Sequence, residues 1–440
     1  MPLPERYAQE VADVVAIWLP EGYFRAQTQI WNAELKAAYQ LDGLPTLEQL
    51  ARIRQALILS PEDIAALNIA KGHETNKLLR RVQSKLPTED GNYVHRGNTS
   101  SDVLDTSLSL QIRSSIDIAQ GDFAKLGANL QKFALQHRDT LQVGRSHGIH
   151  ALPHTFGRQV AGWYSDVREG VTIFDKARDA ISYGKLSGEV GTHVFIRPEL
   201  EELALSQLGL KPDPAPSQVI SRVRHAQVAS LMAVNGGILE RIATNVRLLS
   251  MTDVGEVREP FDPREQQGSS AMPHKRNPEL SERICGLARL IRGNALAQLE
   301  SMALWFERDI SHSSVERSTF QDIFGNLSYA ARLATHVIGG LVVYTDRMSE
   351  NMGKTYGGIY SSRLLNELLP RGLARTDAYE LVKGLSQRAL DTRTDLQALA
   401  SRDPKIREFL TTEELAEVFQ PGYYLRNIDV AFKRLGILEE

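Results

Sequence analysis

The sequence predicts an all-α protein with a long central helix bundle, and three observations lead to that prediction. Apolar residues recur at alternating spacings of four and three over residues 112–133, hydroxyl and proline signals mark helix starts, and few runs alternate like strands. The helical patterns are shorter near both ends of the chain. We therefore expect an N-terminal helical domain at 1–98, a central bundle at 99–349 and a C-terminal helical domain at 350–440.

The strongest helical pattern is a narrow apolar seam in the central part. Its members are Ile112, Ile116, Ala119, Phe123, Leu126, Leu130 and Phe133. A period of 3.5 residues is typical of supercoiled bundles. Further long helices are expected at about 225–251 and 288–306, with a fourth capped by Ser313 and Glu316. Long seamed helices often pack against copies of themselves, so we expect them to form the core of an oligomer.

Local signals place several shorter helices. Thr46 after Pro45 and Ser60 before Pro61 are typical helix starts, and Thr99 with Asp102 fits a capping box before the seamed helix. In the C-terminal part, helical patterns cover 363–369, 377–394 and 412–419.

Composition narrows the class of protein. The chain has 440 residues, 42% hydrophobic and 24% charged, with a net charge of −3, which is ordinary globular composition without the basic excess of a nucleic-acid binder. A single cysteine, Cys285, excludes an intramolecular disulfide framework and suits a reducing compartment. The start of the chain lacks a signal-peptide pattern, and apolar runs such as 14–19 are too short to span a bilayer. We expect a cytoplasmic protein without a membrane or nucleic-acid partner.

A long polar loop at 256–278 interrupts the central helices. It ends in GSSAMPHKRNP, residues 268–278, in which Pro273 and Pro278 exclude a regular helix. A mobile linker is one interpretation. A functional loop is favoured, because a linker needs no Lys275 and Asn277 close behind paired serines.

A first polar cluster, 95–102, directly precedes the seamed helix. Free N–H groups at a helix start bind carboxylates or phosphates, and hydroxyl groups add donors. Plain helix capping explains one hydroxyl, but it does not explain His95 and Arg96 beside it. Both interpretations stay open at this point.

A second cluster, 144–150, is rich in glycine and histidine, and His154 follows. Three histidines suggest a metal site, but no acidic residue or cysteine beside them completes a zinc set. Gly148 and Pro153 predict a turn that presents His147, and an imidazole is a natural acid or base near neutral pH. A structural histidine is the alternative.

A third cluster, 305–317, contains Arg308 and Arg317, whose guanidinium groups suit a carboxylate or phosphate. A surface network of arginines and acids is the alternative. Together the clusters suggest an anionic small molecule held by several helices. In the loop, Ser269 and Lys275 suit removal of a proton from a carbon next to a carboxylate, with Asn277 adding an amide donor to the developing anion. A histidine elsewhere would protonate the leaving group.

These motifs resemble those of the adenylosuccinate lyase family within the fumarase/aspartase superfamily. The resemblance runs nearly the whole chain and rests on Glu5-Arg6-Tyr7, Val94-His95, 99–102, 144–150, 184–188, 222–225, 268–278, 307–314 and 427–429. It implies a three-domain, all-α fold whose middle helices form a homotetramer core, with active sites shared between subunits. It implies no metal and no organic cofactor.

The resemblance also implies a reaction and roles for single residues. The family cleaves fumarate from adenylosuccinate, giving AMP, and usually from the succinyl-carboxamide ribotide of purine biosynthesis. Ser269 would be the base and His147 the acid, with His73, Lys275 and Asn277 completing the catalytic set. The residues expected to bind the nucleotide substrate are Arg6, Tyr7, His95, Thr99, Ser100, Gln218, Arg308, Ser313 and Arg317.

The chain departs from the family pattern at several binding positions. Gly72 stands where the family often has arginine, Asn98 where an apolar residue is common, and Phe306 where a histidine is common. The elimination residues are retained. The alternatives are therefore a superfamily lyase that releases fumarate from another succinylated or amino-acid substrate, and a non-enzymatic helical scaffold.

Overall fold

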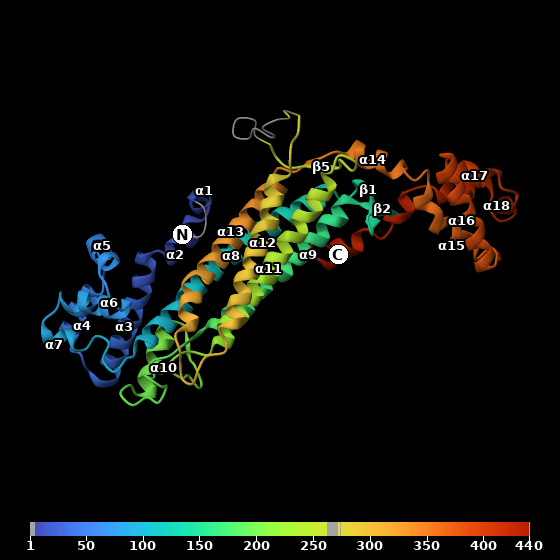
Figure 1. Cartoon of the computed structure of the whole chain (residues 1–440). Helices are drawn as coiled ribbons and strands as arrows, with labels where there is room; N and C mark the ends of the chain where they lie inside the picture. The colour runs from blue at the N-terminus through green and yellow to red at the C-terminus, as the bar shows by residue number, and fades with distance from the viewer. Residues whose placement is uncertain (1–4, 262–271, 273, 440) are drawn as a thin grey trace. The chain divides into compact units, whose positions relative to one another are not determined.

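The structure is a computed structural model that describes residues 5–261, 272 and 274–439 (Figure 1). Helices dominate it, which confirms the predicted all-α class. The chain forms two compact units. Unit 1 contains Met1–Lys125, Arg168–Arg241 and Arg283–Leu333, and unit 2 contains Leu126–Val167, Ile242–Glu282 and Ala334–Glu440. The three-domain division stays a prediction.

Helices open unit 1, and they are short except for the 23-residue helix Pro20–Asp42. They are α1 (Glu5–Ala8), η1 (Gln9–Val11), α2 (Ala12–Trp18), α3 (Pro20–Asp42), α4 (Leu47–Ala56), α5 (Pro61–Ile69), α6 (Glu74–Gln83) and α7 (Thr88–Gly91). The capping boxes of Thr46 and Ser60 are present as predicted. Trp31, Ile53 and Leu78 are fully buried and join α3, α4 and α6 through one apolar core.

Within the described residues, five long helices follow, and each contributes residues to both units. They are α8 (Ser100–Gln136), α9 (Phe156–Ile181), α11 (Arg222–Leu249), α12 (Glu279–Glu300) and α13 (Ser311–Gly339) (Figure 1). The predicted seam of α8 is confirmed, because its first six members have no exposed surface and Phe133 is 9% exposed. Within unit 1, Phe123 packs edge-on against Phe174 of α9, and Asn235 of α11 donates to the Gly170 carbonyl.

Two predicted helix boundaries are wrong. The helix expected at 288–306 begins at Glu279 and ends at Glu300. The next helix begins at Ser311, before the predicted cap at Ser313. The Asp309 carboxylate accepts hydrogen bonds from the N–H groups of Trp305 and Ser311, so it fixes the start of α13.

Short helices also close unit 2. They are α14 (Thr345–Gly353), η2 (Gly358–Tyr360), α15 (Ser361–Leu368), α16 (Arg375–Thr392), α17 (Leu396–Arg402), α18 (Pro404–Phe409), α19 (Thr412–Val418), α20 (Gly422–Leu425) and α21 (Asp429–Arg434). The helices predicted at 363–369, 377–394 and 412–419 are confirmed to within two residues. Leu364, Leu396 and Ile406 are fully buried in the common core of α15 to α19.

The strands are few and short. A hairpin in unit 2 joins β1 (Leu141–Ser146) to β2 (Ile149–Thr155). In unit 1, β3 (Tyr183–Gly184) and β4 (Lys211–Pro212) form a parallel pair beside α10 (Pro198–Gln207), and in unit 2 β5 (Val257–Arg258) is antiparallel to β6 (Val342–Val343). Among the residues that the structure describes, no helix has the length and apolar character needed to cross a membrane.

Candidate active site

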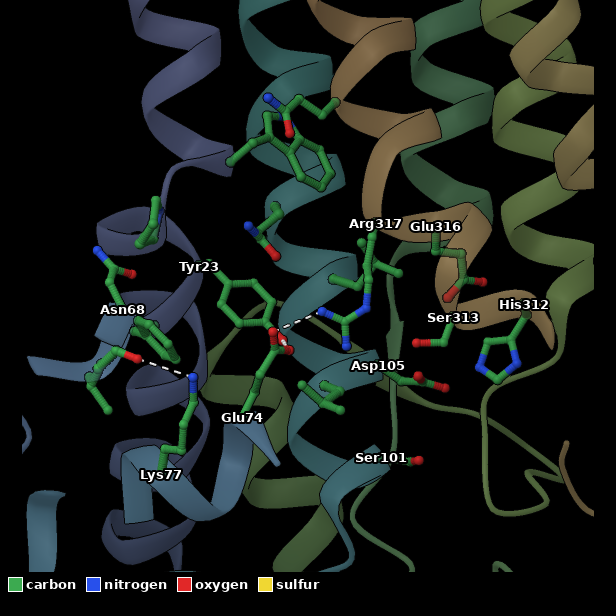
Figure 2. A pocket seen from close by; sticks show the side chains of 18 of the residues that line it. Tyr23, Asn68, Glu74, Lys77, Ser101, Asp105, His312, Ser313, Glu316 and Arg317 are labelled. Carbon is green, nitrogen blue, oxygen red and sulfur yellow. Dashed lines mark hydrogen bonds and ion pairs between the residues drawn. The ribbon is translucent and has the colours of Figure 1, made fainter. Parts of the chain in front are cut away.

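A cavity of about 380 Å³ opens in unit 1 beside the start of α13 (Figure 2). Three of the residues predicted to bind substrate, Arg308, Ser313 and Arg317, line it. The other polar residues of its wall are Tyr23, Asn68, Glu74, Lys77, Ser101, Asp105, Gln111, Arg222, His312, Glu316 and Gln321. The cavity therefore combines several cationic side chains with fixed carboxylates.

Arg317 is held by a carboxylate at one side of the cavity. Its guanidinium donates to Glu74 at 2.8 Å, and the Tyr23 hydroxyl donates to the other Glu74 oxygen at 2.7 Å (Figure 2). Burial alone would raise the pKa of Glu74. The hydrogen bonds from Arg317 and Tyr23 lower the pKa and together outweigh burial, so the net pKa shift is downward. Glu74 is thus an ionised partner, and 57% of the Arg317 side chain remains exposed for a ligand.

A buried arginine with two carboxylates lies behind the cavity. Arg222 donates to Asp105 at 2.6 Å and to Glu316 at 2.7 Å, and all three side chains are at least nine-tenths buried. Burial raises the pKa of Glu316 to about 7, while the Arg222 guanidinium outweighs burial at Asp105 and lowers its pKa to about 2. This bridge joins α8, α11 and α13, and thereby fixes the helix that carries Ser313 and Arg317.

Two residues that are predicted to bind the substrate form a hydrogen bond with each other. Arg308 donates to the Gln218 side-chain oxygen at 3.3 Å, and the neighbouring Ser217 hydroxyl donates to the Glu307 carbonyl at 2.6 Å. The loop before α11 is therefore tied to the loop before α13. His312 is buried beside them, and burial lowers its pKa to about 4, so it is neutral at neutral pH.

The first polar cluster packs against α3 and the start of α8. The Trp31 indole donates to the His95 imidazole at 3.2 Å. Burial and the nearby charge of His73 lower the pKa of His95 to about 4. These two predicted residues therefore lie in one neighbourhood. Thr99 precedes α8 and Ser100 begins it; both are half-buried.

The charged partner of this helix start is Asp102. It accepts the Thr99 N–H at 2.8 Å, which is one of the two hydrogen bonds of the predicted capping box, and it is ion-paired with the fully buried Lys185. Helix capping explains the position of Asp102. It does not exclude ligand binding at the same helix start, so the capping and ligand-binding interpretations of the cluster are compatible.

Of the N-terminal pair, Tyr7 lies in unit 1 against other aromatic and cationic groups. Its ring stacks on Tyr329 at 4.8 Å, with the Arg283 guanidinium 5.0 Å from the ring centre. Arg6 belongs to α1, and its side chain lies outside the described part of the chain.

In unit 2, His147 lies exposed at the tip of the β1–β2 hairpin. Ser146 pairs with Ile149, so His147 and Gly148 form a two-residue turn, and their φ angles of 55° and 77° match a type I′ geometry. The prediction that the sequence presents His147 on a turn is confirmed. The expectation that Pro153 helps to form this turn is wrong, because Pro153 pairs with Val143 inside the hairpin.

A buried carboxylate, Glu256, anchors the base of this hairpin. It accepts from Gln142 at 2.8 Å, from Arg145 at 2.5 Å and from Asn351 of α14 at 2.7 Å. Burial alone would raise the pKa of Glu256. The three donors lower the pKa and together outweigh burial, so the net pKa shift is downward. Since Glu256 itself begins the polar loop, it ties the hairpin to the segment that leads toward the predicted base.

The polar loop is described only in part. Ser269 lies outside the described residues. Lys275 is exposed, Asn277 is half-buried, and α12 begins two residues later. Among the residues that the structure describes, no group of three His, Cys, Asp or Glu side chains is arranged to hold a metal ion.

Sequence reasoning missed part of the cavity wall. Tyr23, Lys77 and Asp105 have no motif of their own, and Arg222 appears only in a family motif without a role. The signal that could have found Arg222 is an arginine at a helix start with carboxylates in two other helices. Only the folded structure brings those carboxylates, 117 and 94 residues away, to it.

Comparison with known proteins settles the family. The Lyase family model matches residues 5–293, and the model described as adenylosuccinate lyase C-terminus matches residues 357–435. The adenylosuccinate lyase of Aquifex aeolicus is 44% identical over 98% of both chains. This chain belongs to the adenylosuccinate lyase family. The adenylosuccinate lyase of Synechocystis sp. is 39% identical over 98% of this chain and 100% of its own.

Solved structures of the wider superfamily share the fold. The crystal structure of 3-carboxy-cis,cis-muconate lactonizing enzyme from Pseudomonas putida matches with a TM-score of 0.86 and 28% identity, covering 97% of this chain and 96% of that one. A fumarate lyase from Mesorhizobium sp. matches with a TM-score of 0.87 and 25% identity, covering 96% and 97%. The higher identity to adenylosuccinate lyases favours that family over another substrate class.

Proposed function

We propose that the chain eliminates fumarate from adenylosuccinate to give AMP, and performs the same reaction on the succinyl-carboxamide ribotide of purine biosynthesis. The observation that carries the proposal is the cavity of unit 1, where Arg308, Ser313 and Arg317 converge in a chain of this family. Guanidinium and hydroxyl groups suit a nucleotide phosphate, which other substrates of the superfamily lack.

In this proposal, the nucleotide binds through residues that unit 1 already holds in place. Arg317 and Ser313 contact the phosphate together with Arg6 and Tyr7, and Arg308 and Gln218 contact the rest of the substrate. Thr99 and Ser100 donate to a carboxylate at the start of α8, where helix N–H groups favour an anion. His73 and His95 complete the wall.

The chemistry belongs to the hairpin and the polar loop. Ser269 takes a proton from the succinyl carbon next to a carboxylate, and the electron pair left behind forms the double bond of fumarate as the carbon–nitrogen bond breaks. His147 protonates the departing nitrogen. Lys275 and Asn277 hold the carboxylate whose charge grows in the transition state. Acid catalysis of this kind contributes about 10²–10⁴-fold, so anion stabilisation must supply much of the remaining rate.

The proposed assembly is a cytoplasmic homotetramer with active sites shared between subunits. It is supported by family membership and by exposed apolar side chains on the long helices, such as Val234, Leu290 and Leu296. Sedimentation should give a tetramer. A stable and fully active monomer would contradict the shared site.

The direct test of the reaction is to mix the purified chain with adenylosuccinate, follow the ultraviolet spectrum and assay fumarate. Equal amounts of AMP and fumarate are expected. Ser269→Ala should fold and bind AMP but lose turnover by orders of magnitude, while near-normal activity would remove Ser269 as the base. A folded wild-type tetramer without turnover would contradict the proposed substrate.

A further inference from the structure

The contact between Trp31 and His95 determines which ring nitrogen of His95, a residue predicted to bind the substrate, carries the proton. The Trp31 side chain is fully buried in α3, and its indole nitrogen lies 3.2 Å from Nδ1 of His95. The two rings meet edge to face, with centres 5.6 Å apart and planes at 73°. This geometry is that of a hydrogen bond between ring nitrogens.

The indole N–H can only donate, so Nδ1 of His95 must accept. A neutral imidazole carries its proton on one nitrogen, so the proton of His95 must lie on Nε2. A doubly protonated ring would place a second N–H against the indole N–H. Burial and the neighbouring His73 also disfavour that charged form, since they lower the pKa of His95 to about 4.

The backbone that carries His95 is held in a defined conformation next to α3. His95 has a φ of 64°, which is uncommon for a residue with a side chain, and Gly97 next to it has a φ of 81°. One turn along α3 from Trp31, both Glu34 oxygens accept from the Asn98 amide at 2.8 Å. Helix α3 is therefore hydrogen-bonded to both ends of the 95–98 segment.

We propose that Trp31 is a positioning residue that keeps His95 in the neutral Nε2–H form, so that His95 donates a hydrogen bond to an oxygen of the bound substrate. In this form Nε2 has no free electron pair, so His95 cannot take a proton from the substrate. The donor role rests on the proposed function, whereas the position of the proton is a property of the protein without ligand.

The first test is nitrogen NMR on the full-length, ligand-free protein labelled at histidine nitrogens, with His95→Asn to identify the His95 signals. At neutral pH, we expect a protonated Nε2 and an unprotonated Nδ1, with the opposite form at least about tenfold less populated, as a single hydrogen bond of typical strength would give. A protonated Nδ1, or a charged ring, overturns the proposal. The result is measured on the wild-type protein, and His95→Asn serves only to identify the signals, since asparagine tolerates the positive φ of this position.

The second test is Trp31→Phe, which keeps an aromatic ring but removes the indole donor. The preference for the Nε2–H form should fall by about tenfold. The matched control is Trp163→Phe, because Trp163 is equally buried in α9 and its ring packs on Phe156. The control should leave the His95 signals unchanged. An unchanged preference for the Nε2–H form in Trp31→Phe would show that Trp31 does not determine which nitrogen of His95 carries the proton.

Addition of AMP separates this inference from the proposed function. If AMP binds by calorimetry, the Nε2 signal of the wild-type protein should move toward the hydrogen-bonded position, and a signal that stays in place overturns the donor role. If AMP does not bind, the proposed substrate fails. The ligand-free spectrum still decides whether Trp31 fixes the proton.

Discussion

The cavity of unit 1 and the hairpin with the polar loop of unit 2 hold their functional side chains in different ways. In unit 1, Arg317 is paired with Glu74, and the helix that carries it is fixed by the buried Arg222 bridge. In unit 2, His147 and Lys275 are exposed, and the buried Glu256 anchors the hairpin that carries His147. Arg317 thus belongs to a helix that a buried bridge fixes, whereas His147 and Lys275 stand outside the core.

This difference has a thermodynamic consequence. Removing a member of the buried Arg222 bridge leaves an uncompensated charge, so the bridge in the wall of the cavity also stabilises the fold. Exposed residues contribute little to folding, so those of unit 2 can be replaced with small effects on stability. The predictions below test this contrast, from the largest expected effect to the smallest.

His147→Gln should separate catalysis from stability most clearly. We expect kcat to fall by about 10²–10⁴-fold through loss of the acid. The free energy of unfolding should change by less than about 0.5 kcal/mol, because the side chain is exposed. Steady-state kinetics and urea unfolding give both quantities. His336→Gln, an exposed histidine of α13 in the same unit, is the control and should change neither. A large loss of stability in His147→Gln would remove the contrast.

Arg222→Met should have the opposite profile. It leaves Asp105 and Glu316 buried without their partner, so we expect a loss of about 3–5 kcal/mol in the free energy of unfolding. Arg292→Met removes the more exposed pair with Glu240 and should cost at most about 1 kcal/mol. Urea titrations of both variants measure the difference. Equal losses would mean that burial of the Arg222 bridge does not matter.

Arg317→Met should act mainly on substrate affinity. A charged hydrogen bond is typically worth about 1.5–3 kcal/mol, so KM for adenylosuccinate should rise by about 10–100-fold. Arg25→Met, which breaks an exposed pair with Glu21 on α3, is the control. An unchanged KM in Arg317→Met would exclude a phosphate at this position and favour a different substrate.

The buried Glu34 should make the stability of the fold depend on pH. Burial raises its pKa from 4.5 to about 8, so the folded state holds a proton that the unfolded state releases. Its favourable contribution is complete below pH 4.5 and is lost as the pH rises toward 8. Glu34→Gln should therefore reduce the fall in unfolding free energy between pH 5 and 6.5 by about 2 kcal/mol. An identical slope in wild type and variant would contradict the shifted pKa, and exposed Glu21→Gln is the control.

The sequence predicted local features better than the cavity wall. The seam of α8 follows from a period of 3.5, and the starts of α4 and α5 follow from Thr46 and Ser60. The cap at Ser313 failed because the Asp309 carboxylate, four residues earlier, supplies the first acceptor. Pro153 lies in a strand because its missing N–H removes only one bond from a two-stranded ribbon.

The partners in the cavity could not be predicted from spacing. Glu74 lies 243 residues from Arg317, and Asp105 lies 117 residues from Arg222. No local pattern encodes such pairs, because they depend on which helices pack together. The resemblance supplied Arg317 as a binding residue, but the structure was needed to find the carboxylate that holds it.

The most direct test of the central contrast is equilibrium binding of AMP to His147→Gln and Arg317→Met, measured by calorimetry beside the wild-type protein. We predict that His147→Gln binds AMP within about twofold of wild type, since glutamine keeps a hydrogen-bond donor for the nitrogen that His147 is proposed to protonate. Arg317→Met should bind at least about tenfold more weakly, because it loses a charged contact with the phosphate. Wild-type affinity in Arg317→Met, or lost binding in His147→Gln, would contradict the assignment of binding to unit 1 and of chemistry to unit 2.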